Sequence, residues 1–83
     1  MRDAAIIEVD GYVLAPSLLV WRMPAGPDKA GPELIGYVLR DLHGRDGWNW
    51  RSMDCHWGGM IEEEPFESAD AAFRDMVEWW RGR

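Results

Sequence analysis

The side chains best suited to chemistry are concentrated in one stretch, GWNWRSMDCHWGGM, at residues 47–60. It holds the only cysteine, Cys55, directly before His56, and the second histidine, His43, lies twelve residues before Cys55. A structural zinc site takes four ligands, usually in closely spaced pairs. The chain has no such pair, and adjacent residues of a strand point to opposite faces. We therefore expect no metal or cofactor here, and keep a metal protein or enzyme using Cys55, His56 and His43 as a second alternative.

Catalysis by the Cys55 thiol would need a base within hydrogen-bond reach. His56 is badly aimed as a direct neighbour, and His43 would have to reach across a hairpin. The three consecutive acids at 62–64 could supply paired carboxylates, but burial would make them raise one another's pKa values, so we expect them in solvent. The sequence therefore predicts a protein that is not an enzyme.

The six tryptophans give a second set of candidate binding residues. Trp48 and Trp50 share one face if residues 48–53 form a strand. A helix over that face would place both in the core, which is what we expect. If the face were exposed, Trp48, Trp50 and Arg51 could stack bases or hold a small ligand, and a small-ligand or nucleic-acid binder is our first alternative. Trp57, in a turn, and Trp79, on the shoulder of a helix, are better candidates for exposure.

Most of the net negative charge of the chain lies in its last third. Residues 1–53 have a net charge of −1, whereas residues 54–78 contain eight acids and one arginine, and the whole chain has a net charge of −6. A surface with this charge repels nucleic acid and anionic membranes and attracts a basic partner. We therefore expect no direct contact with nucleic acid or membrane.

These observations predict a protein-binding module whose acidic third docks on a basic protein surface. The expected partner-binding residues are a charged rim and two aromatic anchors: Glu62, Glu63, Glu64, Glu67, Asp70, Trp57 and Trp79. In size, acidity and lack of catalytic groups, the chain is similar to phage-encoded inhibitors of bacterial defence such as anti-CRISPR proteins, some of which cover nucleic-acid-binding surfaces. This resemblance of composition implies an inhibitor of a nucleic-acid-binding defence complex.

Length and composition indicate one small domain over residues 1–83. A single cysteine cannot form an internal disulfide. Acids at positions 3, 8 and 10 interrupt what would be the apolar part of a signal peptide, and the longest apolar runs are too short to cross a bilayer. We expect a cytoplasmic protein.

The first half of the chain predicts strands separated by tight turns. Residues 4–9 are rich in β-branched side chains and favour a strand, and Asp-Gly at 10–11 is a strong turn signal. Residues 12–23 indicate a strand broken near Pro16, which is either an edge strand or two short pieces. An edge there could pair with a second copy, so a homodimer is possible. The proline- and glycine-rich segment 24–32 is expected to be a loop.

The middle of the chain predicts a β-hairpin. Residues 33–42 suit a central strand, 43–47 a turn, and 48–53 a strand with alternating faces. Residues 54–59 are expected to form a second turn. Residues 60–64 are expected to form a further strand paired back to 48–53.

The last segment predicts an amphipathic helix over about residues 68–81, with Ser68 as N-cap and Gly82 after its end. One stripe contains its apolar residues: Ala69, Ala72, Phe73, Met76, Val77 and Trp80. The expected fold is α+β, an antiparallel sheet of three to five strands with this helix packed on one face.

Overall fold

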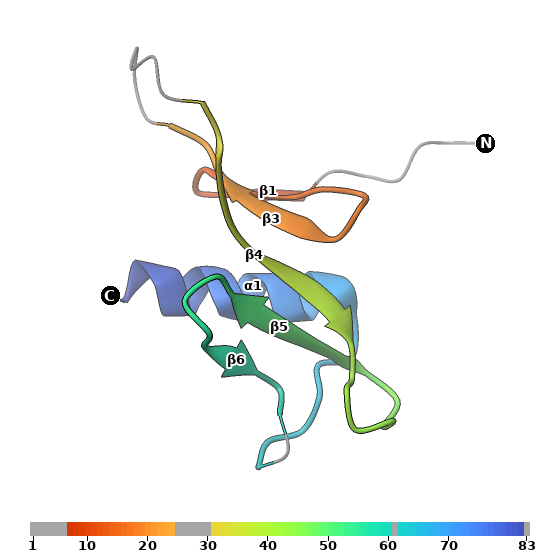
Figure 1. Cartoon of the computed structure of the whole chain (residues 1–83). Helices are drawn as coiled ribbons and strands as arrows, with labels where there is room; N and C mark the ends of the chain where they lie inside the picture. Colours follow the sequence, from red (N-terminus) through yellow and green to blue (C-terminus); the bar gives the residue numbers. More distant parts are fainter. Residues whose placement is uncertain (1–6, 25–30, 61, 83) are drawn as a thin grey trace, which may run out of the picture.

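The computed structural model of the chain describes residues 7–24, 31–60 and 62–82. Within these residues, one antiparallel sheet of six strands follows the order of the chain, and one helix lies across one of its faces (Figure 1). The elements are β1 (Ile7–Val9), β2 (Tyr12–Leu14), β3 (Leu19–Arg22), β4 (Glu33–Arg40), β5 (Trp48–Ser52), β6 (Trp57–Gly58) and α1 (Ala69–Arg81). The α+β class and the C-terminal helix are confirmed, but the sheet of the described residues has one strand more than the upper limit of five that we expected.

Tight turns join the first three strands. Asp10 and Gly11 both have positive φ values, 51° and 87°, as the two central residues of a type I′ hairpin turn require. The segment around Pro16 separates β2 from β3, so the expected broken strand is two pieces. Both pieces lie inside the sheet, whose edges are β1 and β6. Of the two alternatives for residues 12–23, two short pieces is therefore confirmed, and an edge strand available for pairing with a second copy is wrong. Residues 4–6 of the first expected strand and 25–30 of the expected loop lie outside the described residues.

β4 is central, since it pairs with β3 on one side and with β5 on the other. This confirms the predicted hairpin of residues 33–53. The strand expected at 60–64 is wrong: its described residues form no strand, and β6 lies instead within the segment that we expected to be only a turn. The chain reverses directly after β6, where the Glu63 N–H donates to the Met60 carbonyl at 2.7 Å. That reversal leaves no room for an extended strand.

The helix begins where the sequence predicts. The Ser68 hydroxyl accepts a hydrogen bond from the Ala71 N–H at 3.0 Å, and the helix ends before Gly82. Its buried stripe contains Ala72, Phe73, Met76 and Val77. Gly36 of β4 faces this stripe, because a β-carbon there would collide with the Met76 side chain. The stripe thus closes the main core against the sheet.

A β-bulge adjusts β4 to the helix. Val20 pairs with Gly36 and Trp21 pairs with Leu34, so Ile35 is the extra residue between them. Ile35 is only 1% exposed and belongs to the core cluster together with Val20. The bulge therefore adds the large apolar side chain of Ile35 to the core. It lies next to Gly36, whose missing side chain leaves space for the helix.

The tryptophans of β5 belong to the helix side of the sheet. Trp50 is 2% exposed, and its indole Nε1 donates to Asp75 of α1 at 2.9 Å. Trp48 is partly buried against the same core. Trp50 is therefore a core residue, as expected, whereas Trp48 lies at the margin of the core and is only partly buried. Arg51 points to the opposite face, so an exposed platform made of Trp48, Trp50 and Arg51 does not exist in this fold.

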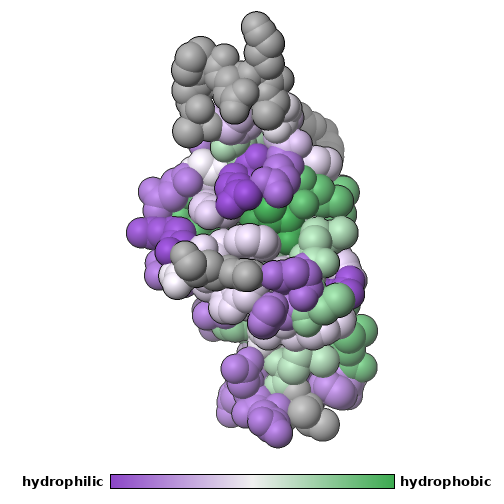
Figure 2. All heavy atoms as spheres, turned by 60° about the vertical axis from the view of Figure 1, so that its left-hand side comes forward, coloured by the Kyte–Doolittle hydropathy of each residue, from purple (hydrophilic) through white to green (hydrophobic). Residues whose placement is uncertain are grey.

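The face away from the helix carries a row of side chains across four strands: Leu19, Tyr37, Arg51 and Trp57. The Arg51 guanidinium lies 6.0 Å from the centre of the Tyr37 ring and 5.4 Å from that of Trp57. Figure 2 shows apolar side chains gathered along the right-hand side of that view, and hydrophilic ones spread over its left, centre and lower parts. The sheet is thus covered by a helix on one face and by cation–aromatic stacking on part of the other.

Candidate functional site

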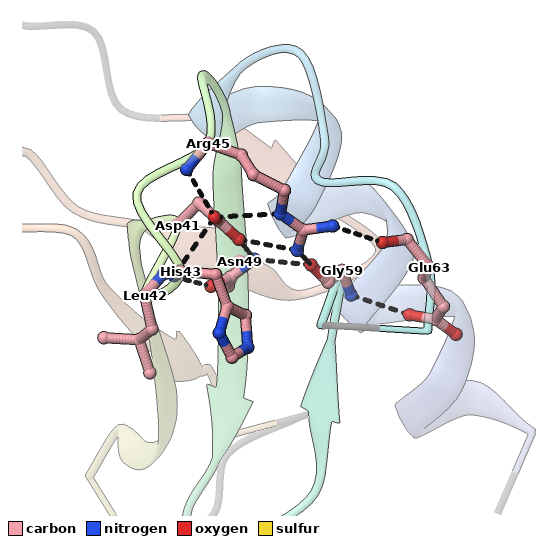
Figure 3. A network of polar contacts seen from close by, with 7 residues as sticks. All are labelled: Asp41, Leu42, His43, Arg45, Asn49, Gly59 and Glu63. Carbon is pink, nitrogen blue, oxygen red and sulfur yellow. Dashed lines mark hydrogen bonds and ion pairs between the residues drawn. The ribbon is translucent and has the colours of Figure 1, made fainter.

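A buried polar network fixes the loops that build the candidate site (Figure 3). At its centre, the Asp41 carboxylate accepts from the Arg45 guanidinium through both oxygens, at 2.8 and 3.0 Å. The backbone N–H groups of His43 and Arg45 also donate to it. These bonds hold the pKa of Asp41 far below its usual range, and those from the Arg45 side chain have the largest effect. The carboxylate therefore stays charged and ties the turn after β4 to Arg45.

Asn49 of β5 extends this network to Gly59, directly after the neighbouring strand β6. Its side-chain amide is fully buried, donates to Asp41 at 3.0 Å and to the Gly59 carbonyl at 2.7 Å, and accepts from the Leu42 N–H at 2.9 Å. Arg45 donates to the same Gly59 carbonyl at 2.9 Å and to the Glu63 carbonyl at 2.8 Å. Segment 59–63 is thereby held against β5 by side chains from two separate elements.

Glu63 closes the network from the other end. Its carboxylate accepts from the Gly59 N–H at 2.8 Å, while its own carbonyl accepts from Arg45. Both bonds fix the direction in which the Glu63 side chain leaves the loop. Sequence reasoning treated Glu63 as one of three equivalent acids. The signal for the network was the polar Asn49 at a strand position, because a buried side-chain amide needs polar partners nearby.

The network places Glu63 at the edge of a cleft of about 370 Å³ between β6 and the C-terminal half of α1. Buried Trp50 and Gly58 form its floor. A β-carbon at position 58 would collide with the Trp50 indole, so glycine is needed there for β6 to lie this close. The remaining lining residues are two tryptophans and three acids: Trp57, Trp79, Glu63, Asp75 and Glu78. We call this hollow the acidic cleft.

Its two aromatic residues are held in different ways. Trp57 is 37% exposed and lies on the short edge strand, with the Arg51 guanidinium stacked 5.4 Å from its ring centre. Trp79 is partly buried, with its ring centre 5.4 Å from that of Trp50 and 4.6 Å from that of His56. Both indoles are therefore set in place before any partner arrives.

The acids of the cleft have few cations of their own. Glu78 lies 3.4 Å from Arg81, whose guanidinium also pairs with Asp10 at 2.7 Å. Within the described ranges, no lysine or arginine side chain forms an ion pair with Glu63 or Asp75. Asp75 instead accepts a neutral hydrogen bond from Trp50. The cleft therefore has an excess of negative charge beside aromatic walls.

The expected partner-binding residues fall into two groups. Trp57, Trp79 and Glu63 meet in the acidic cleft, and Glu62 lines an adjoining hollow of about 400 Å³ with Trp57, Glu63 and Met60. Glu64 is exposed on the neighbouring loop, beside Arg45. Glu67 and Asp70 lie near the start of α1, where Asp70 pairs with Arg74 at 2.8 Å, and they do not line the cleft.

Sequence reasoning missed Asp75 and Glu78. The spacing of Asp75 and Trp79 places them one turn apart on the same side of a helix, which is a usable signal. It could not be interpreted without knowing that β6 lies beside that side of the helix.

Cys55, His56 and His43 lie in turns outside the helix and the strands. Cys55 has a φ of 73° in the turn after β5, and its sulfur accepts from Arg51 at 3.0 Å. His56 Nδ1 lies 3.2 Å from an Asp54 oxygen, and His43 lies on the separate turn between β4 and β5. In the part of the chain that the structure describes, no group of three His, Cys, Asp or Glu side chains is placed to hold a metal ion.

The helix found in the described residues is too short to cross a membrane. Comparison with known proteins gives no further guide to the site: no family model matches the chain, and no curated protein or solved structure is significantly similar to it.

Proposed function

We propose that the chain is a non-enzymatic protein-binding module that docks on a basic surface of a partner protein through the acidic cleft. The observation that supports this most is the composition of the cleft, where three carboxylates lie around two tryptophans. A partner that presents positive and apolar groups together would satisfy both features.

Electrostatics supports a basic partner. The charge of −6 on a chain of this size speeds association with positively charged surfaces and discourages negatively charged ones. Glu62, Glu64 and Glu67 are exposed and lie outside the cleft. Their expected role is to attract and orient the partner, while the acids of the cleft make direct contact.

The aromatic residues supply the apolar part of the contact. Tryptophan is enriched among the residues that dominate binding energy at protein interfaces, particularly when it is already rigid and becomes desolvated. Trp79 fits this description, because it is stacked on Trp50 and lines the cleft. Trp57 borders the cleft from β6, while its indole stacks with Arg51 on the other face of the sheet. Docking would remove Trp79 from water without a large cost in side-chain order.

A protein surface that binds nucleic acid has the required positive charge. We therefore propose, as the more specific form of this function, an inhibitor that occupies such a surface on a defence complex. The compositional similarity to phage-encoded inhibitors supports this form of the proposal.

The general function is tested with a short arginine- and lysine-rich peptide and a copy in which glutamine replaces each basic residue. Tryptophan fluorescence follows binding at low salt (about 0.05 M) and at high salt (about 0.5 M). We expect the basic peptide alone to bind, and its affinity to fall by about tenfold or more over this range, because screening weakens contacts between exposed charges. Equal affinity at both salt concentrations would contradict the electrostatic account.

A further inference from the structure

We infer that the acidic cleft binds a single arginine side chain of the partner, with the guanidinium against Asp75 and Glu78 and the aliphatic stem along the Trp79 indole. The inference rests on the proposed function and adds the chemical group that the cleft recognises.

The size of the cleft favours one side chain. Its volume of about 370 Å³ is near the lower end of the range for small-ligand sites, roughly 300–1,000 Å³. A helix about 10 Å across could not enter it. A long side chain projecting from the partner surface could enter and reach the Trp50 floor.

Asp75 is the acid best prepared to receive a cation. One of its oxygens accepts from the indole N–H of Trp50, which is 2% exposed, so a rigid core group fixes the carboxylate at the cleft. Glu78 lies one helical turn further along and lines the same cleft. The described residues provide no ion pair for Asp75, which keeps its charge uncompensated. A cation in the cleft therefore gains two carboxylates without breaking an ion pair of Asp75.

The aromatic walls favour arginine over lysine. A guanidinium is planar, carries five N–H donors and stacks on aromatic rings, whereas an ammonium is a compact and strongly hydrated charge. Among the described residues the fold stacks a guanidinium on a tryptophan three times: Arg22 on Trp80 at 5.6 Å, Arg40 on Trp48 at 4.9 Å, and Arg51 on Trp57 at 5.4 Å. A planar cation can face an indole and pair with carboxylates at its edge at the same time.

The test is an NMR titration of the ¹⁵N-labelled chain with Nα-acetyl-arginine amide and, separately, with Nα-acetyl-lysine amide. We expect the arginine compound to shift the indole N–H signals of Trp79 and Trp50. The indole signal of Trp21 is the internal control, because Trp21 lines a different, apolar hollow with Val13 and Met23. We expect the lysine compound to bind at least about threefold more weakly.

Two isosteric variants test the acids. Asp75→Asn keeps an oxygen that can accept from Trp50, and Glu78→Gln keeps the shape of an exposed side chain, so both should fold. Each should weaken arginine binding by about two- to fivefold, the range measured for exposed charge pairs. The matched control is Asp46→Asn, which removes one fully exposed acid in the turn between β4 and β5 and should leave binding unchanged.

The outcomes separate this inference from the proposed function. Equal binding of the two compounds, an arginine shift at Trp21 in place of Trp79 and Trp50, or no loss in Asp75→Asn and Glu78→Gln would overturn the arginine site. The docking function would still stand if the basic peptide bound in a salt-dependent way. Failure of both the arginine compound and the basic peptide to bind would overturn both proposals.

Discussion

Replacing Asn49 with alanine should destabilise the fold by about 3 kcal/mol, because Asn49 links the turn after β4 to Gly59 through the polar network. Its fully buried side chain makes three hydrogen bonds, to Asp41, to the Gly59 carbonyl and from the Leu42 N–H. Each such bond contributes roughly 0.5–1.5 kcal/mol, and their sum gives the expected loss. The Leu42 N–H would lose its acceptor, whereas the Gly59 carbonyl would keep its bond from Arg45. The loss should therefore remain within the sum of the three bonds.

The measurement is urea unfolding followed by tryptophan fluorescence, with the free energy of unfolding extrapolated to water. Leu42→Ala is the matched control, since the Leu42 side chain is 55% exposed in the same loop and its removal should change stability by less than about 0.5 kcal/mol. Asn49→Ala should also weaken peptide binding, because the network positions Glu63 in the cleft. A loss below about 1 kcal/mol would refute the view that this network holds segment 59–63 in place.

Three further predictions concern single groups. Gly58→Ala should lower stability by about 1–3 kcal/mol in a thermal melt, because the alanine β-carbon would collide with the Trp50 indole. The control is Gly31→Ala, where a β-carbon would meet open space and the melting temperature should not change. Equal melting temperatures of the two variants would contradict the packing of β6. Ser68→Ala should cost about 1 kcal/mol in urea unfolding through loss of the helix cap, and an unchanged midpoint would show that the cap does not contribute. The pKa of Asp41 is lowered from 3.8 in the folded state, so its stabilising effect should be complete above that pH and decline as the pH falls below it. The stability gap between wild type and Asp41→Asn, measured by unfolding from neutral to acidic pH, should therefore shrink at low pH, and a gap that widens would contradict this linkage.

Local signals predicted the elements whose causes are local. The helix follows from its apolar stripe and its Ser68 cap, and the first hairpin follows from Asp10-Gly11. Strand alternation placed Trp48 and Trp50 on one face, and the helix stripe supplied the cover that makes this face the core. These conclusions needed no knowledge of distant contacts.

The segment after β5 could not be predicted because distant contacts decide its course. β6 can lie directly against Trp50 only because residue 58 is a glycine. The chain then turns back because Arg45, from another loop, binds the carbonyl groups of Gly59 and Glu63. A run of acids with an apolar start gives no hint of either contact, which is why a strand at 60–64 was the wrong prediction.

The sequence predicted some of the residues of the candidate site, but not the full set that lines the cleft. Trp57, Trp79 and Glu63 were expected to act together, and the fold brings them to one cleft. Asp75 and Glu78 join them only because β6 lies beside the C-terminal half of α1. Glu67 and Asp70 stay outside it because they lie near the other end of the helix.

The central claim is that the acidic cleft itself, and not the overall negative charge, binds the basic partner. The most direct measurement compares the affinity of two charge-matched triple variants for the basic peptide at low salt. One removes the acids of the cleft by Glu63→Gln, Asp75→Asn and Glu78→Gln, and the other removes exposed acids elsewhere by Glu8→Gln, Glu33→Gln and Asp46→Asn. We predict a loss of about tenfold or more for the first variant and less than about threefold for the second. Equal losses would contradict the claim.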